Sequence, residues 1–205
     1  MKYYPPSNHI YYENSDIPIN KLNIKELKII TEIEKELLAR AYEHLHTELD
    51  ENIKFDEKYL CKVHEQIFFQ LYDWAGKFRT VNISKDESMF CPYSNLSSFS
   101  NEIFIKLKND NFLKDFEDIS KKDEFIDKLA FYICELNVLH PFNEGNGRAL
   151  RLFFDMIVTF NGYEYINYED TLENDDYIKA SIDCMIADCE KMKTILQKGL
   201  NKVFS

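Results

Sequence analysis

Residues 125–160 read FIDKLAFYICELNVLHPFNEGNGRALRLFFDMIVTF, in which two apolar stretches flank a short polar loop. The first stretch repeats apolar residues at helical spacing, so we predict a helix over 125–139. Pro141 ends it, because the residue before a proline avoids the α region. The second stretch predicts a helix over 147–160, since the Asn-Gly pair that follows is a usual stop signal. The sequence therefore predicts a helix–loop–helix unit.

Outward from this unit the chain is also mainly helical. Helical periodicity predicts further helices over residues 22–46, 56–72, 96–107, 176–186 and 188–200. The period breaks over 73–93, where alternation predicts a β-hairpin with its tip at 85–88 and its return strand at 89–91. Three prolines make residues 1–20 an extended arm. We expect a mainly α fold, with one small β-hairpin on a single helical domain over 21–205.

Composition narrows the class of protein. The chain has 205 residues, 45% of them apolar, which is enough for one domain with its own core. Its net charge of −11 disfavours direct nucleic-acid binding, which needs a large cationic surface. A local group of arginines and backbone N–H groups can still bind a nucleotide.

The cysteines and the apolar runs bear on location. Five cysteines are scattered without a CxxC pair, which favours free thiols in a reducing compartment over disulfides or zinc. The first 20 residues hold no apolar signal-peptide core, and no run is long and apolar enough to span a bilayer. We expect a soluble, cytoplasmic protein with no membrane partner.

The loop itself suggests an anion site. Gly145 and Gly147 allow positive φ and a close backbone approach, so consecutive N–H groups can form an anion-binding concavity that runs into the next helix. Arg148 and Arg151 fall on one face of the first helical turn, where cations oppose the helix dipole. An anion between them would remove that conflict, and a polyphosphate fits.

Two further loop residues have chemistry suited to a phosphate. Glu144 is a hard oxygen ligand, placed to hold Mg²⁺ together with phosphates. His140 lies at the mouth of the loop, where an imidazole of near-neutral pKa is a natural general base for a hydroxyl. Phe142 is predicted to be a buried anchor that fixes the loop.

Each residue also has a plainer interpretation. A histidine after a helix is usually an ordinary core or surface residue, and an Asn-Gly pair is usually a turn. Arg151 is spaced to pair with Asp155 one turn later, although the cation-first order is the weaker one. These alternatives weaken together, because every position has a compatible role in one reaction.

The segment resembles the signature of the Fic (filamentation induced by cAMP) family, HxFx[D/E]GNGRxxR, and matches every specified position. Residues 71–79 and 82–85 resemble the segment that leads into the family's target-binding flap. With the helix order, the resemblance covers about 20–200. It implies a Fic-type helical bundle and transfer of AMP from ATP to a Ser, Thr or Tyr hydroxyl of another protein.

The resemblance also implies residue roles. His140 would deprotonate the target hydroxyl, and Glu144 would bind Mg²⁺. Nucleotide contacts would come from Asn137, Asn143, Gly145, Asn146, Gly147, Arg148, Arg151 and Lys85. Tyr177 is a candidate neighbour of the adenine, although a core or surface tyrosine is the favoured interpretation. The flap, about 77–93, would pair with an extended stretch of the target protein by strand addition.

Other functions stay open. Kinase-like relatives similar to Doc toxins carry lysine where this chain has Gly147, so the resemblance favours adenylylation over phosphorylation. Transfer of UMP and a catalytically idle regulatory module are the remaining alternatives. Many Fic proteins are silenced by a helix with the pattern [S/T]xxxE[G/N], whose Glu pairs with the second motif arginine. Residues 47–52 match it loosely, so we instead expect a separate antitoxin to supply a Glu to Arg151, as in two-component toxins.

Overall fold

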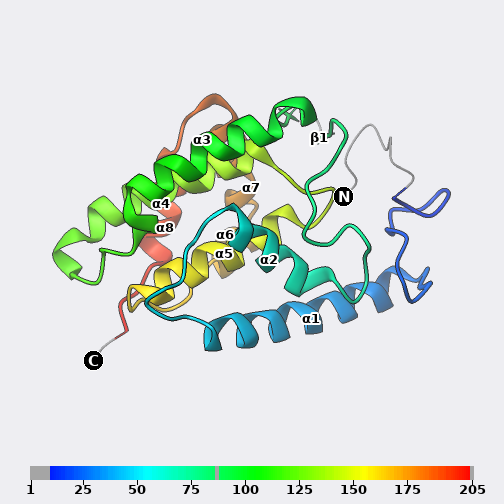
Figure 1. Cartoon of the computed structure of the whole chain (residues 1–205), viewed down its shortest axis with the longest axis horizontal. Coiled ribbons are helices and arrows are strands. Elements are labelled where there is room, and N and C mark those ends of the chain that lie inside the picture. The colour runs from blue at the N-terminus through cyan, green and yellow to red at the C-terminus, as the bar shows by residue number, and fades with distance from the viewer. Residues whose placement is uncertain (1–9, 86–87, 204–205) are drawn as a thin grey trace.

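The computed structural model describes residues 10–85 and 88–203, and it confirms a mainly α fold (Figure 1). The first nine residues of the predicted arm and part of the predicted hairpin tip lie outside this range. Its helices and strands are α1 (Leu27–Thr47), α2 (Glu57–Phe68), β1 (Ser84–Lys85), β2 (Ser88–Met89), α3 (Leu96–Asn109), α4 (Lys122–Leu139), α5 (Asn146–Phe160), α6 (Glu169–Glu173), α7 (Asp176–Asp183) and α8 (Glu190–Gly199). Short 3-10 turns η1 (Tyr93–Asn95), η2 (Asn111–Leu113), η3 (Ile119–Lys121) and η4 (Cys184–Ile186) lie between them.

Helix α5 forms the centre of the core. Every residue from Leu152 to Val158 is buried, as expected of a helix that is apolar on nearly all sides. It packs against α1, α2 and α4, so its N-terminus is held from several directions. The polar loop before α5 is therefore attached directly to the centre of the core.

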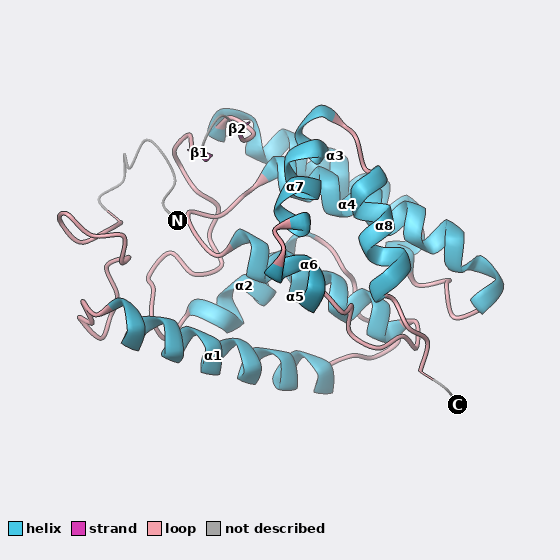
Figure 2. Cartoon of the chain, turned by 180° about the vertical axis from the view of Figure 1, so that it is seen from behind, coloured by secondary structure: helices cyan, strands magenta, loops and turns pink. Residues whose placement is uncertain are grey.

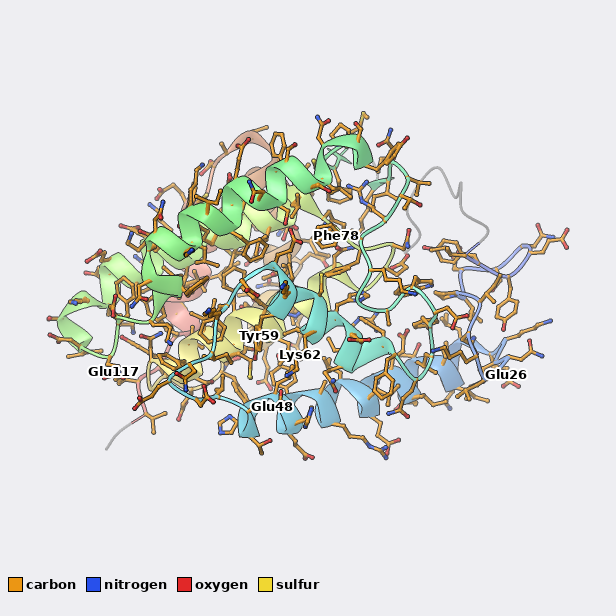
Figure 3. The ribbon with its side chains drawn as sticks, in the orientation of Figure 1. Glu26, Glu48, Tyr59, Lys62, Phe78 and Glu117 are labelled. Carbon is orange, nitrogen blue, oxygen red and sulfur yellow. A yellow bond between two sulfur atoms is a disulfide. The ribbon has the colours of Figure 1, made fainter. Side chains whose placement is uncertain are left out.

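Helices α1 and α2 pack against each other along one side of α5 (Figure 1). Asp56 caps α2 as predicted, because its carboxylate accepts from the backbone N–H of Tyr59 at 2.9 Å. Lys62 on α2 donates to Glu48, just beyond α1, at 2.6 Å (Figure 3). This bond therefore adds to the packing that holds the two helices together.

The ends of α1 and α2 differ from the prediction. Helix α1 begins at Leu27 rather than at residue 22, because Asn20 binds Ile24 through both ends of its side-chain amide and Asn23 adopts φ 54°. Helix α2 ends at Phe68, before the predicted residue 72, and a tight turn follows it. Before α1, hydrogen bonds from the Asn20 side chain therefore take the place of the backbone hydrogen bonds of a helix.

The hairpin is short and lies at one end of the bundle (Figure 2). Ser84 pairs with Met89 and Lys85 with Ser88, in antiparallel register. A hairpin is therefore present in the predicted region, but its bounds were wrong: Lys85 and Ser88, predicted for the tip, pair as strand residues, and the return strand stops at Met89 and not at residue 91.

Helix α8 and turn η4 pack against α4, and α7 packs against both of them (Figure 2). The prediction of free thiols was wrong for two cysteines, because the structure joins Cys134 of α4 to Cys184 of η4 as a disulfide. The two residues are 50 positions apart and meet only through packing. Cys61, Cys91 and Cys189 are free, as predicted. In the described residues no helix has the length and apolarity needed to cross a bilayer.

Candidate active site

The loop between α4 and α5 turns through two left-handed residues. His140 has φ 46° and ends α4, next to Pro141 as predicted, and Gly145 has φ 77° and precedes α5. A Cβ at Gly145 would lie 2.4 Å from the ring of Phe68, so only glycine fits there. The prediction of a positive φ was wrong for Gly147, because α5 begins at Asn146 and Gly147 is already part of the helix.

A two-way hydrogen bond closes the loop. The Asn146 amide donates to the carbonyl of Phe142 and its oxygen accepts from the N–H of Phe142, both at 2.8 Å. Asn146 and Phe142 are fully buried, so Phe142 is the predicted anchor. Because this side chain is committed to the loop, Asn146 can offer a phosphate only its backbone N–H.

His64 of α2 supports the loop and was missed from the sequence. Its Nδ1 accepts from the N–H of Gly76 at 2.9 Å, so Nε2 carries the proton and donates to the carbonyl of Glu144 at 3.0 Å. The ring stacks on Phe142 with centroids 3.8 Å apart. Burial lowers the pKa of His64 to about 3, which keeps the ring neutral. The sequence feature that could have indicated this role is the position of His64 on the apolar face of a predicted helix.

His140 is more enclosed than the sequence suggested. Its ring stacks on Phe90, just after the hairpin, at 3.7 Å, and only 6% of the residue is exposed. Burial lowers its pKa to about 3, so the predicted near-neutral pKa and open position were wrong. Its Nδ1 lies 3.1 Å from the carbonyl of Asn137, an acceptor only, so Nδ1 carries the proton. Nε2 is therefore the basic nitrogen.

Arg79, which is buried, ties the hairpin region to the loop. Its guanidinium donates to the carbonyls of His140 at 2.9 Å, Val81 at 2.6 Å and Leu139 at 3.3 Å, and also to that of Cys91. Its N–H donates to the carbonyl of Pro141 at 2.8 Å. This role was missed from the sequence, because backbone carbonyls as partners leave no charge pattern to recognise.

Glu144 presents a half-buried carboxylate beside the turn. It accepts a hydrogen bond from the hydroxyl of Tyr11, and burial raises its pKa while the Tyr11 bond and Arg148 lower it. The described residues contain no group of three His, Cys, Asp or Glu able to enclose a metal. One carboxylate fits Mg²⁺ when substrate phosphates complete the coordination, which is how Mg²⁺ usually binds.

The two motif arginines face different neighbours. Arg148 pairs with Glu34 of α1 at 2.7 Å and lies over the ring of Phe68 at 4.7 Å. Arg151 lies over the ring of Tyr177 at 5.5 Å. Glu34 was missed, because nothing in a glutamate-rich helix distinguishes it. The carboxylate of Glu34 is therefore the anion beside Arg148, where we had expected the phosphate of a ligand.

The plainer interpretation of Arg151 does not hold. Asp155 accepts from the hydroxyl of Tyr42 at 2.5 Å and from the N–H of Ile166 at 3.0 Å. In the part of the chain that the structure describes, no ion pair joins Asp155 to Arg151. Arg151 therefore has no carboxylate bonded to it in these residues.

Of the remaining predicted residues, Lys85 lies near enough to His140 for its charge to help lower the pKa of the imidazole. The Asn137 amide donates to the carbonyl of Ser181 at 2.8 Å, which fastens α4 to α7. Lys85 lies in β1 and Asn143 in the loop, both half-buried. Tyr177 is a buried core tyrosine, as favoured. In the loose match to the inhibitory pattern, Glu51 is exposed beyond the end of α1.

Comparison with known proteins identifies the class: the chain matches the Fic/DOC family over residues 54–158 and belongs to that family. It is 31% identical over 204 residues to Protein adenylyltransferase VbhT of Bartonella schoenbuchensis, covering 98% of this chain and 41% of that protein. It is also 31% identical over 153 residues to the Probable protein adenylyltransferase Fic of Escherichia coli, covering 75% of this chain and 73% of that one. The chain thus spans well under half the length of VbhT.

Solved structures agree with this membership. BepC of Bartonella tribocorum, solved with bound AMPPNP, has a TM-score of 0.80 over 95% of this chain and 97% of that one, at 20% identity. The type IV secretion system effector protein BepA has a TM-score of 0.76 over 94% and 68%, at 27% identity. The predicted Fic-type fold is confirmed.

Proposed function

We propose that this chain transfers AMP from ATP to a Ser, Thr or Tyr hydroxyl of a target protein and releases pyrophosphate. One observation carries the proposal: Nδ1 of His140 donates to the carbonyl of Asn137, which leaves Nε2 as the basic nitrogen. Glu144 follows His140 by four positions in the same loop. The relatives VbhT and Fic are named protein adenylyltransferases, which supports it.

In the proposed reaction Nε2 of His140 accepts the proton of the target hydroxyl. The hydroxyl oxygen bonds to the α-phosphorus, and the bond from that phosphorus to the bridging oxygen breaks, so pyrophosphate leaves. A neutral imidazole is required, and burial keeps His140 neutral at physiological pH. Its lowered pKa makes it a weak base, so we expect bound substrate to raise that pKa.

The start of α5 would bind the triphosphate. The backbone N–H groups of Gly145, Asn146 and Gly147 lie at the N-terminus of this helix, where the dipole favours anions. Arg148 and Arg151 would hold the β and γ groups, Arg148 after exchange of Glu34 for phosphate. Asn137, Asn143 and Lys85 remain further candidates for nucleotide contact.

Mg²⁺ would be held by Glu144 together with the phosphates, and when bound it would neutralise charge that develops on the leaving group. The fit rests on one half-buried carboxylate whose charged form burial disfavours. A cation beside it would offset that cost.

Two partners belong to the proposal. A target strand would pair with the flap, about 77–93, which contains the hairpin of β1 and β2, because the edge of a strand carries backbone N–H and C=O groups that can pair with a further strand. A separate antitoxin would supply a Glu to Arg151, which is supported by the arginine's lack of a bonded carboxylate among the described residues.

Labelled ATP tests the function. Incubated with Mg²⁺ and a cell lysate, the chain should transfer label from the α phosphate and not from the γ phosphate. His140→Ala should abolish the transfer, a loss of at least about 10²-fold, whereas His44→Ala, on the exposed face of α1, should leave it unchanged. Label from γ would mean a kinase. Absence of both labels, with antitoxin excluded, would favour the idle module, and α-labelled UTP tests the remaining alternative.

A further inference from the structure

The arm before α1 reaches the loop through Tyr11, whose hydroxyl donates to Oε1 of Glu144. The two residues are 133 positions apart, and Tyr11 lies outside the segment that matches the family. This contact is therefore made by fold and not by the motif.

The arm is built to hold Tyr11 in place. Tyr11 pairs with Pro18 in an antiparallel bridge, and the N–H of Ile19 donates to the carbonyl of Ile10 at 2.6 Å. Ile17, between them, is only 5% exposed and belongs to the hydrophobic core. The N–H of Lys21 donates to the carbonyl of Leu71 at 2.8 Å, just beyond α2. The hydroxyl is thus presented by an anchored turn, which reduces the entropy lost in making the bond.

Glu144 is held at two points. His64 fixes its backbone through the carbonyl, as described, and Tyr11 binds one oxygen of its carboxylate. A carboxylate has two oxygens and about four acceptor sites, so a bond from Tyr11 leaves capacity for a cation. A hydrogen bond of this kind orients a metal-binding carboxylate and limits its rotation.

We propose that Tyr11 is a positioning residue: its hydroxyl orients the Glu144 carboxylate toward the divalent cation that accompanies the nucleotide. The inference rests on the proposed function, in which Glu144 holds Mg²⁺. It adds a residue from the arm to a site whose other residues come from α1, α2, α5, the hairpin region and the loop between α4 and α5.

The test measures how much Mg²⁺ tightens nucleotide binding. Calorimetry would give the Kd of α,β-methylene-ATP, which cannot release pyrophosphate, once with Mg²⁺ and once with EDTA. The ratio of the two values is the metal-dependent gain. Tyr11→Phe should reduce this gain about tenfold, as expected for loss of a partner to a metal ligand. Its Kd in EDTA should stay within about twofold of the unsubstituted chain, because a contact to a metal ligand acts only when metal is present.

Tyr12→Phe is the matched control, since the Tyr12 hydroxyl bonds to Asn23 on the surface and not to the loop. Its gain should equal that of the unsubstituted chain. An unchanged or larger gain in Tyr11→Phe would overturn the inference, the larger one meaning that Tyr11 competes with the metal. Equal weakening in Mg²⁺ and in EDTA would also overturn it, since that is a purely structural effect.

Failure of the metal site itself is separable. Glu144→Gln should remove the gain entirely. If it does not, Glu144 is not the metal ligand and the inference about Tyr11 fails with it. Transfer of the α label can still occur in that case, so the proposed adenylyl transfer is judged by the labelling experiment alone.

Discussion

Arg148 and Arg151 lie on two sides of α5 and have different partners. On the α1–α2 side, Arg148 is paired with Glu34, which also accepts from the hydroxyl of Tyr72 at 2.6 Å. On the α7 side, Arg151 lies against the ring of Tyr177 and bonds to no carboxylate in the described residues. The motif gives both positions the same residue type, but packing gives them different charge environments. A phosphate reaching Arg148 has to displace a carboxylate, whereas one reaching Arg151 does not.

The largest predicted effect is on stability and concerns the α7 side. Cys184→Ser should lower the free energy of unfolding by about 2–4 kcal/mol, because the disulfide closes a long loop in the unfolded chain. Urea unfolding without reductant measures this. Cys189→Ser, a free cysteine, should have little effect. If dithiothreitol left the stability of the unsubstituted chain unchanged, the α7 side would not depend on this bond.

The next effect is on nucleotide binding. Arg151→Ala should weaken the affinity for α,β-methylene-ATP by about 10²-fold, because charge-assisted hydrogen bonds to phosphate contribute roughly 1.5–3 kcal/mol each. Arg148→Ala should lose less, since Glu34 offsets part of that charge. Calorimetry on both variants decides between the sides. A larger loss in Arg148→Ala would reverse the comparison.

A third prediction concerns pH and the two buried histidines. In the unfolded chain each imidazole protonates near 6.5, but in the folded chain His64 and His140 stay neutral down to about 3. The unfolded state therefore binds more protons over this window, and stability falls as pH falls, by up to about 1.4 kcal/mol per pH unit for each histidine. Asp155 acts in the opposite direction, because burial raises its pKa to about 6.

Removing one histidine tests this assignment. His140→Asn tolerates the left-handed backbone and cannot titrate, so its loss of stability between pH 6.5 and 5 should be smaller than that of the unsubstituted chain. Urea unfolding at several pH values gives the slope. Parallel slopes for the two proteins would mean that His140 is not buried as described.

The smallest predicted effect separates affinity from stability on the α1–α2 side. Glu34→Gln should tighten nucleotide binding several-fold, because Arg148 no longer has a competing carboxylate. It should also lower stability by about 1 kcal/mol, since a half-buried ion pair is lost. Glu32→Gln, which alters an exposed pair with Lys35 on the same helix, should change neither. Weaker binding in Glu34→Gln would mean that Glu34 holds Arg148 ready for phosphate.

Much of the fold was predictable because it depends on local pattern. Long helices with a regular apolar face were found in the right order, and the cap at Asp56 was found from its type and position. Helix α6 was missed because five residues, Glu169–Glu173, are too few to show a period. Helix α1 begins later than predicted because the side chain of Asn20 forms hydrogen bonds with the nearby backbone of Ile24.

The candidate site was only half predictable. Loop residues were recognisable because a short motif concentrates glycine, arginine, glutamate and histidine. Their partners came from elsewhere in the chain: Tyr11 from the arm, Glu34 from α1, His64 from α2 and Arg79 from the segment before the hairpin. Each is an ordinary residue in its own segment and acquires its role only by proximity.

The sequence by itself determined which segments are helical, where the central loop bends and which chemical groups the loop carries, since these follow from backbone preferences and side-chain type over a few residues. Tertiary structure alone decided the charge state and the partners of those groups. Burial against Phe90 keeps His140 neutral, packing on α1 pairs Arg148, and the meeting of α4 with η4 brings Cys134 to Cys184. Desolvation and long-range contact depend on what lies nearby in space, and no local pattern records that.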